Sequence, residues 1–165
     1  MQKIITGKTY VLGKNIDTDQ IYPGRYLELT DAADIVKHVL EGADESFPQK
    51  IKAGDIIVAG TNFGCGSSRE QAAVALRTAG LGAVVAESFA RIFYRNGINM
   101  GLPLITSPGI TQKIKEGDVI SIDITSGEVK NQKGEVLAKA EPISDYMLNI
   151  LEHGGIKPLL AKRFV

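Results

Sequence analysis

The sequence is poor in the side chains that form disulfides and hold soft metals. Its 165 residues include one cysteine, Cys65, and two histidines, His38 and His153. A single cysteine excludes an internal disulfide. One cysteine and two histidines cannot by themselves build an iron–sulfur or zinc site, which usually takes three or four such ligands. We therefore expect this chain to bind no metal or cofactor of its own.

The sequence also lacks an excess of charge of either sign. Lysine and arginine total 19, aspartate and glutamate total 19, and the formal net charge is zero. Binding to nucleic acid or to an anionic lipid surface usually requires a basic excess that neutralises phosphates. No apolar run approaches the roughly 20 residues of a spanning helix, and the first residues lack the apolar stretch of a signal peptide. We expect a cytoplasmic protein without nucleic-acid or membrane partners.

Alternating strands and helices are predicted for the middle of the chain. The hydrophobic content of 44% suffices for a buried core, and no repeat, low-complexity block or long linker divides the sequence, so one domain over residues 1–165 is expected. Compact apolar runs indicate strands at 55–59, 82–87 and 102–105, with helices between them at 68–79 and 88–97. This order predicts a partly parallel sheet with right-handed crossovers.

The two flanking regions have different patterns. Before the centre, the sequence predicts a strand at 8–12, a polar loop at 15–26, a helix at 31–41 capped by Asp31 and an exposed connection at 43–52. After it, period-two alternation over 118–141 predicts a β-meander, followed by a helix at 144–155 and a basic tail. The predicted class is α/β: a mixed, partly parallel sheet with flanking helices and a late meander.

The glycine-rich segment GTNFGCGSSREQ at 60–71 has two interpretations. Ser67 with Glu70, or Ser68 with Gln71, can form a capping box at a helix start. Alternatively, Gly64, Cys65 and Gly66 can form a nest of backbone N–H groups that binds an anion, with Ser67, Ser68 and Arg69 gripping a carboxylate. The segment matches neither the phosphate-loop nor the dinucleotide pattern, because no lysine precedes the serine and Arg69 replaces the third glycine.

Other reactive residues have ordinary explanations. Cys65 near a helix start can be a nucleophile, but no histidine lies in a local partner motif, so a small buried filler is favoured. Asp17, Thr18 and Asp19 can bind a cation, but carboxylates before Pro-Gly are more often turn residues. His38 and His153 sit on predicted helices, where a solvent-facing or C-terminal histidine needs no function.

Three motifs together resemble the small subunits of isopropylmalate dehydratases, which are equivalent to the swivelling C-terminal domain of aconitase. They are NIDTDQIYPGRYL, GTNFGCGSSREQAAVAL and AVVAESFARIFYRNGINMGLPLI, and the resemblance covers nearly the whole chain. It implies a β/β/α swivel domain. It also implies a partner, because in this family a separate large subunit carries a four-iron, four-sulfur cluster and the two subunits dehydrate and rehydrate a small hydroxy acid.

The resemblance also implies roles for individual residues. Ser67 would be the base that removes a proton next to the substrate carboxylate, with iron of the large subunit as Lewis acid, while Ser68 and Arg69 would bind a carboxylate. Thr18 and Asp19 would belong to the active-site face, with Thr18 binding the substrate and Asp19 acting as a catalytic residue that orients groups of the large subunit. Aconitase has a serine at the position of Tyr22, so this position is left out of the catalytic set.

The segment after the Asp-Thr-Asp motif resembles the family's specificity loop. Relatives that act on homoaconitate tend to carry arginine at the place of Glu28, whereas here Leu27 and Leu29 offer apolar surface beside a negative charge. This pattern favours the isopropyl group of 2- and 3-isopropylmalate, intermediates of leucine biosynthesis. Dimethylmalate, citramalate or homoaconitate remain alternative substrates.

Two readings of the same residues need no large subunit. A stand-alone carboxylate-binding module would use the glycine-rich segment without chemistry, and it would bind its ligand alone. A small hydrolase using Ser67 is disfavoured, because no histidine or lysine base lies nearby in the sequence. An enzyme subunit would instead gain activity only with its partner.

Overall fold

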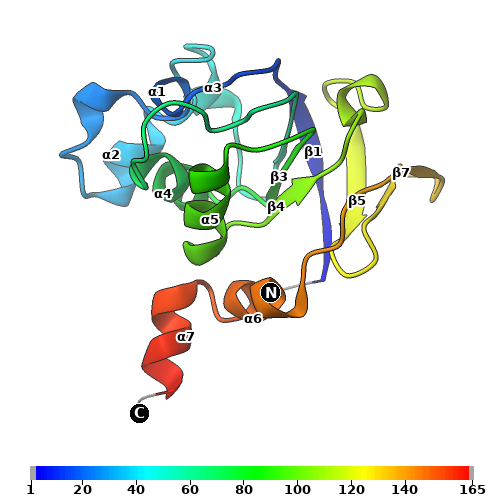
Figure 1. The fold of residues 1–165 in the computed structure, drawn as a ribbon. Helices are drawn as coiled ribbons and strands as arrows, with labels where there is room; N and C mark the ends of the chain where they lie inside the picture. The colour runs from blue at the N-terminus through cyan, green and yellow to red at the C-terminus, as the bar shows by residue number, and fades with distance from the viewer. Residues whose placement is uncertain (1–2, 164–165) are drawn as a thin grey trace.

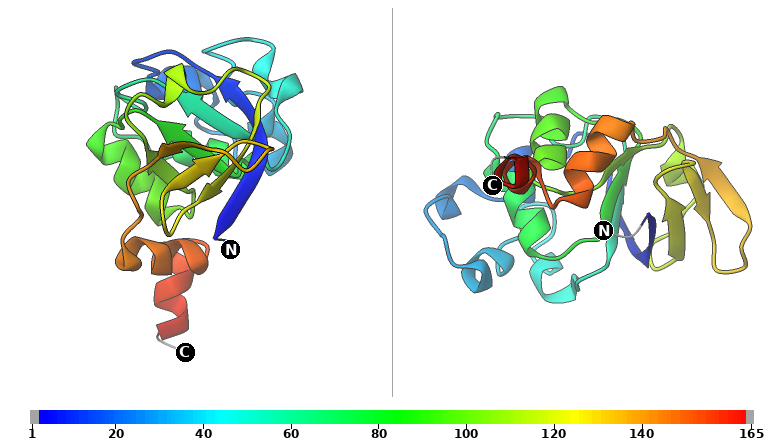
Figure 2. Two further views of the ribbon diagram at one scale, coloured as in Figure 1. Left: turned by 90° about the vertical axis from the view of Figure 1, so that its right-hand side faces the viewer. Right: turned by 90° about the horizontal axis from the view of Figure 1, so that it is seen from below.

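A computed structural model describes residues 3–163 and shows a seven-stranded mixed sheet in the order β4-β3-β2-β1-β5-β6-β7 (Figure 1). Its strands are β1 (Ile4–Val11), β2 (Ile56–Ala59), β3 (Ala83–Ala86), β4 (Leu104–Thr106), β5 (Val119–Asp123), β6 (Glu128–Lys130) and β7 (Val136–Lys139). The sheet curls into a half-barrel, which is clearest in the two further views of Figure 2.

The parallel half of the sheet forms the centre of the core. β1, β2, β3 and β4 pair in parallel. Every residue of β2 and β3 is buried, so the strands read as continuous apolar runs. Between them run α4 (Gln71–Thr78) and α5 (Arg91–Asn99), which contact each other. The predicted alternation of strands and helices is confirmed.

The antiparallel half begins on the other side of β1. The first half of β1 pairs with β5, with Ile4 opposite Asp123, and β5, β6 and β7 form the predicted meander. Burial alternates along β5, with Ile120 and Ile122 facing the core. β1 begins at Ile4 rather than at residue 8 because this early part has its own strand partner.

Short helices follow β1, and two further helices end the described chain. The helices that follow β1 are α1 (Thr18–Ile21), the 3-10 helix η1 (Gly24–Tyr26), α2 (Ala32–Val36) and α3 (Phe47–Lys50). The 3-10 helix η2 (Ile110–Gln112) precedes the meander, and α6 (Asp145–Glu152) and α7 (Ile156–Arg163) follow it. In Figure 1 and in the left view of Figure 2, α7 projects from the lower end of the molecule. No helix within residues 3–163 is long and apolar enough to cross a bilayer.

Several predicted boundaries were wrong for a tertiary reason. The helix predicted at 31–41 ends at Val36, because the Leu40 N–H donates to Ile21 O at 2.7 Å and Leu40 has a positive φ of 57°. Asp31 does cap this helix, by accepting from the Ala33 N–H. The connection at 43–52 is not simply exposed, since it contains α3 and Phe47 is buried against Tyr10.

The last helix also differs from its prediction. The helix expected at 144–155 stops at Glu152, and Gly154 and Gly155 both adopt positive φ before α7 begins. The basic tail is therefore helical up to Arg163, and its last two residues lie outside the described range. Leu159 anchors α7 by packing into the core.

Candidate functional site

Two loops meet beyond the carboxyl ends of β1 and β2 and bring the first two motifs together. The Thr18 N–H donates to Cys65 O at 2.8 Å, and the Gly64 N–H donates to Ile16 O at the same distance. Asp17 and Cys65 form an isolated parallel bridge. Residues far apart in sequence thus share one short strand-like pairing, which places the candidate site residues on one face.

Two glycines make this close pairing possible. Gly64 and Gly66 have φ values of +86° and +104°, and a side chain on Gly64 would collide with the ring of Phe93. The expected anion nest is wrong in one respect: the Gly64 N–H is already donated to Ile16 O and cannot bind a ligand. Gly64 therefore serves the packing of the two loops, whereas an anion site at Cys65 and Gly66 stays a prediction.

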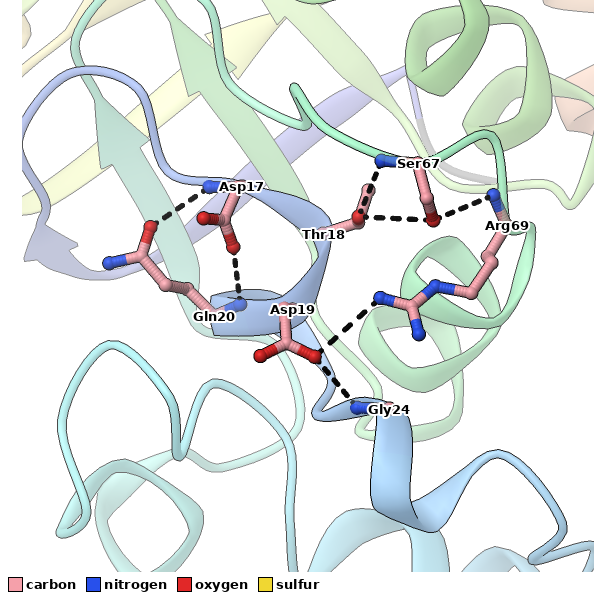
Figure 3. A network of polar contacts seen from close by, with 7 residues as sticks. All are labelled: Asp17, Thr18, Asp19, Gln20, Gly24, Ser67 and Arg69. Carbon is pink, nitrogen blue, oxygen red and sulfur yellow. Dashed lines mark hydrogen bonds and ion pairs between the residues drawn. The ribbon is translucent and has the colours of Figure 1, made fainter.

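Ser67 is exposed, and the side chain of Thr18 contacts both its N–H and its hydroxyl. The Ser67 N–H donates to Thr18 Oγ1 at 3.2 Å, and the two hydroxyl oxygens lie 3.5 Å apart. The Arg69 N–H approaches Ser67 Oγ at 3.5 Å (Figure 3). Thr18 is only 2% exposed. Its hydroxyl thus contacts Ser67 rather than open solvent, which differs from the direct substrate contact expected for Thr18.

Asp19 and Arg69 form an ion pair across the same face. Asp19 Oδ1 lies 3.6 Å from the Arg69 guanidinium and accepts the Gly24 N–H at 2.8 Å (Figure 3). A Cβ atom on Gly24 would lie 2.9 Å from Arg69 Nη1, so the missing side chain leaves room for the guanidinium. The Asp19 side chain is 70% exposed and the Arg69 side chain 27%. Both groups remain able to meet a ligand.

The capping interpretation of the serines is wrong. α4 begins only at Gln71, its N-cap is Glu70, and no side chain caps it. Ser67 and Ser68 are exposed and precede this helix, so its dipole acts on them weakly, since the dipole effect fades beyond the first turn. Thr18 and Arg69 hold Ser67 instead.

Asn96 is a site neighbour that the sequence alone did not reveal. Its side-chain Nδ2 donates to Ser68 O at 3.3 Å and ties the serine loop to α5. Asn96 lies inside the third family motif, beside residues that pack the core. No local pattern distinguishes it from any polar residue on a helix surface.

The predicted specificity loop is a tight turn after η1. Leu27 and Leu29 are half-buried and pack against the core, whereas Glu28 is exposed. The Leu29 N–H donates to Tyr26 O at 3.1 Å and closes the turn. Because η1 begins at Gly24 beside Arg69 and ends at Tyr26, it joins this turn directly to the ion pair.

Other candidates have structural roles. Asp17 forms a capping box with Gln20 at the start of α1, which satisfies its carboxylate. Tyr22 is 3% exposed, donates its hydroxyl to Tyr26 O at 2.8 Å, and burial raises its pKa. Cys65 is half-buried. Within residues 3–163, no three His, Cys, Asp or Glu side chains group closely enough to hold a metal ion.

Comparison with known proteins assigns the fold to one family. Residues 14–108 match the family described as the aconitase C-terminal domain. The chain belongs to this family. It is 52% identical over 163 residues to the 3-isopropylmalate dehydratase small subunit 1 of Methanopyrus kandleri, covering 98% of this chain and 95% of the relative.

Further relatives of similar identity carry different names. The isopropylmalate/citramalate isomerase small subunit of Methanocaldococcus jannaschii is 52% identical, covering 99% of this chain and 97% of the relative. The methanogen homoaconitase small subunit of Methanothermobacter thermautotrophicus is 51% identical, covering 94% of this chain and 90% of the relative. A crystal structure of 3-isopropylmalate dehydratase from Methanocaldococcus jannaschii has a TM-score of 0.91 at 47% identity and covers 98% of this chain and 95% of the other. These matches confirm the predicted family and fold class.

Proposed function

We propose that this chain is the small subunit of a hydro-lyase that interconverts 2-isopropylmalate and 3-isopropylmalate by dehydration and rehydration, a step of leucine biosynthesis. The observation that carries the proposal is the exposed Ser67 hydroxyl, supported by buried Thr18 beside the Asp19–Arg69 pair. Relatives named as 3-isopropylmalate dehydratase small subunits match along nearly their whole length. The site lies on an open face, as half of a cleft completed by a large subunit would.

In this mechanism Ser67 is the general base. Its oxygen, as the alkoxide, removes a proton from the carbon next to a substrate carboxylate, and the electron pair of that C–H bond forms the double bond. The hydroxyl on the neighbouring carbon leaves as hydroxide, which an acid on the large subunit would protonate to water. Rehydration reverses these steps with the hydroxyl placed on the other carbon. A serine is a weak acid, so the Arg69 N–H near Ser67 Oγ and the guanidinium charge would stabilise the alkoxide.

Arg69 and Ser68 would hold the substrate carboxylate. A guanidinium offers a planar, two-pronged donor that matches a carboxylate, and Asp19 keeps this group oriented across the face. When the carboxylate binds, it competes with Asp19 for Arg69, which frees Asp19 to contact groups of the large subunit.

The donor set of this chain does not fit an iron–sulfur cluster, because Cys65 is its single cysteine. The resemblance assigns the four-iron cluster to the large subunit, and no step above is derived through it. The cytoplasmic location stays a prediction.

The test is reconstitution with a cluster-bearing isopropylmalate dehydratase large subunit. We expect the purified chain alone to be inactive and the complex to show its highest kcat/KM on isopropylmalate. Turnover by the chain alone would refute the split site. A kcat/KM for homoaconitate or citrate that equals or exceeds the isopropylmalate value would refute the substrate assignment.

Citramalate is the second candidate substrate, because a relative named as an isopropylmalate/citramalate isomerase small subunit is as similar as one named for 3-isopropylmalate dehydratase. The same assay separates them. Calorimetric titration of the isolated chain with isopropylmalate tests the alternative of a stand-alone carboxylate-binding module. Such a module would bind isopropylmalate without a partner subunit.

A further inference from the structure

Tyr26 is the anchor of the turn that carries Leu27 and Leu29. Its carbonyl accepts two hydrogen bonds, from the Leu29 N–H at 3.1 Å and from the Tyr22 hydroxyl at 2.8 Å. Tyr26 therefore closes the turn at Leu29, while the Leu27 N–H donates to Gly24 O at 3.3 Å at the start of the turn. A displacement of Tyr26 would loosen the end of the turn at Leu29.

The Tyr26 ring is in turn held by His38. The two rings stack with centroids 3.5 Å apart and planes 10° from parallel. His38 Nδ1 lies 2.8 Å from Glu41 Oε2, and the Arg25 guanidinium reaches Glu41 Oε1 at 3.1 Å while covering the Tyr26 ring at 5.0 Å. We refer to Arg25, Tyr26, His38 and Glu41 as the His38 cluster.

The segment that carries His38 is itself fixed to the catalytic face. The Leu40 N–H donates to Ile21 O at the end of α1, and a Cβ on Gly42 would lie 2.7 Å from Gln20 Cα. A concavity of about 650 Å³ is lined by Asp19 together with Arg25 and Glu41. The His38 cluster thus spans from the turn to the element that presents Asp19.

We propose that His38 is a positioning residue for substrate selection, which stacks on Tyr26 and thereby fixes the turn that contacts the substituent of the malate. The proposal rests on the proposed function, in which Leu27 and Leu29 receive an alkyl group. It differs from an ordinary structural role, because the stack leaves Ser67 and Arg69 untouched. Loss of the stack should therefore change which substrate is preferred more than how fast bound substrate reacts.

The experiment compares His38 variants in the reconstituted complex, with kcat and KM measured for 3-isopropylmalate and citramalate. His38→Ala removes the ring and the bond to Glu41. We expect its KM for isopropylmalate to rise about three- to tenfold with kcat within about twofold, which is the size of effect an aromatic pair gives. The preference for isopropylmalate over the smaller citramalate should fall by a similar factor.

Two further variants separate the ring from the hydrogen bond. His38→Phe keeps a stacking ring and should retain the wild-type preference, whereas His38→Gln keeps a partner for Glu41 and should behave like His38→Ala. His153→Ala is the matched control, because His153 Nδ1 contacts Asn149 O at 2.8 Å on α6 and has no place in the site. The control should leave both kinetic constants unchanged.

A second readout does not depend on any substrate. Hydrogen exchange of the Leu29 amide in the isolated full chain should be about three- to tenfold faster in His38→Ala and His38→Gln than in wild type. His38→Phe and His153→Ala should exchange as wild type does. If the wild-type complex did not act on isopropylmalate, the proposed function would fail, but this measurement would still decide whether His38 fixes the turn.

Three results would overturn the proposal. One is unchanged Leu29 exchange in His38→Ala and His38→Gln. Another is a uniform loss of kcat on both substrates with an unchanged preference, which a merely structural role would produce. The third is a His38→Phe variant as impaired as His38→Ala. Because His38→Gln and His38→Phe keep part of the contacts, they remain informative if His38→Ala fails to fold.

Discussion

The two sides of the candidate site are held in place by different means. On the catalytic side, Ser67 rests on a buried hydroxyl from α1, and short backbone bonds between two loops fix its position. On the selecting side, the turn after Tyr26 is fixed by a stack with His38, whose side chain is 24% exposed. We expect the first arrangement to tolerate little change and the second to be alterable with less effect on the chemistry.

This difference suggests a hypothesis for why relatives of similar identity are named for different substrates. Relatives of 51% and 52% identity are named for homoaconitase, isopropylmalate/citramalate isomerase and 3-isopropylmalate dehydratase. Overall identity therefore does not report the substrate. If the catalytic side is common to these proteins and the turn varies, changes on the first side should affect every substrate alike, and changes on the second should redistribute activity among substrates.

Ser67→Ala tests the catalytic side most directly. Loss of a general base typically lowers kcat by about 100- to 10,000-fold, and here the loss should be equal for isopropylmalate and citramalate. The thermal unfolding of the isolated chain should change little, because Ser67 does not cap α4. Near-normal kcat per folded complex would remove Ser67 from the mechanism.

Arg69→Lys should have the next largest effect. A lysine keeps the charge but cannot provide the two-pronged contact to a carboxylate, so KM should rise about ten- to a hundredfold for all substrates. Steady-state kinetics on isopropylmalate and citramalate measure this. Arg77→Lys, at an arginine that contacts the carbonyls of Met100 and Gly154 away from the site, serves as the control. Equal effects of the two variants on KM would contradict the role given to Arg69.

Glu28→Arg tests the selecting side with a change of charge. The new guanidinium can pair with the additional carboxylate of homoaconitate and removes the repulsion from Glu28. We expect the ratio of kcat/KM values for homoaconitate over isopropylmalate to rise at least about tenfold. Glu135→Arg, at an exposed glutamate in the meander, controls for the overall charge. An unchanged ratio would mean that this turn does not contact the substrate.

Thr18→Val asks whether the buried hydroxyl supports Ser67. The substitution keeps the shape but removes the acceptor of the Ser67 N–H, so we expect kcat to fall about five- to tenfold on every substrate while KM changes less. A shift in substrate preference instead would show that the two sides are coupled. Unfolding by denaturant should show a loss of about 1 kcal/mol.

These contacts also mark what the sequence could and could not reveal. Buried strands such as Ile56–Ala59 were predicted because apolar runs and glycine breaks are local signals. The end of α2 was not, because the Leu40 N–H binds Ile21 O from another element. Likewise, the capping residues around Ser67 looked sufficient in sequence, but Thr18 holds this serine across the chain.

For the site, the motifs predicted the residues, and the resemblance predicted their roles. The supports were missed: Asn96 against Ser68 and His38 against Tyr26 depend on folding distant segments together. His38 was expected to be solvent-facing and without function because it lies on a predicted helix. The helix ends before it, and the following turn places its ring on Tyr26.

The smallest expected change in stability concerns Glu41, whose carboxylate pairs with His38 and Arg25 beside the turn. Burial alone would raise the pKa of this carboxyl, but the hydrogen bond and charge of His38, with help from Tyr26 and Arg25, outweigh it and lower the pKa. A carboxyl whose pKa is lowered by folding stabilises the fold above its unfolded pKa, and this contribution is lost as the pH falls through the folded pKa.

Glu41→Gln, which resembles the protonated carboxyl, should therefore be less stable than wild type near pH 6, by under about 1 kcal/mol for a partly exposed pair. The difference should shrink as the pH falls through the folded pKa of Glu41, because wild type then becomes protonated as well. Urea unfolding of the isolated chain between pH 6 and pH 3 measures this difference. Hydrogen bonds lower the pKa values of Asp44 and Asp123, so both proteins share the pH dependence of the free energy of unfolding that these two carboxyls cause. A gap that does not shrink between pH 6 and pH 3 would show that the substituted amide disturbs packing around His38 rather than removing a charge.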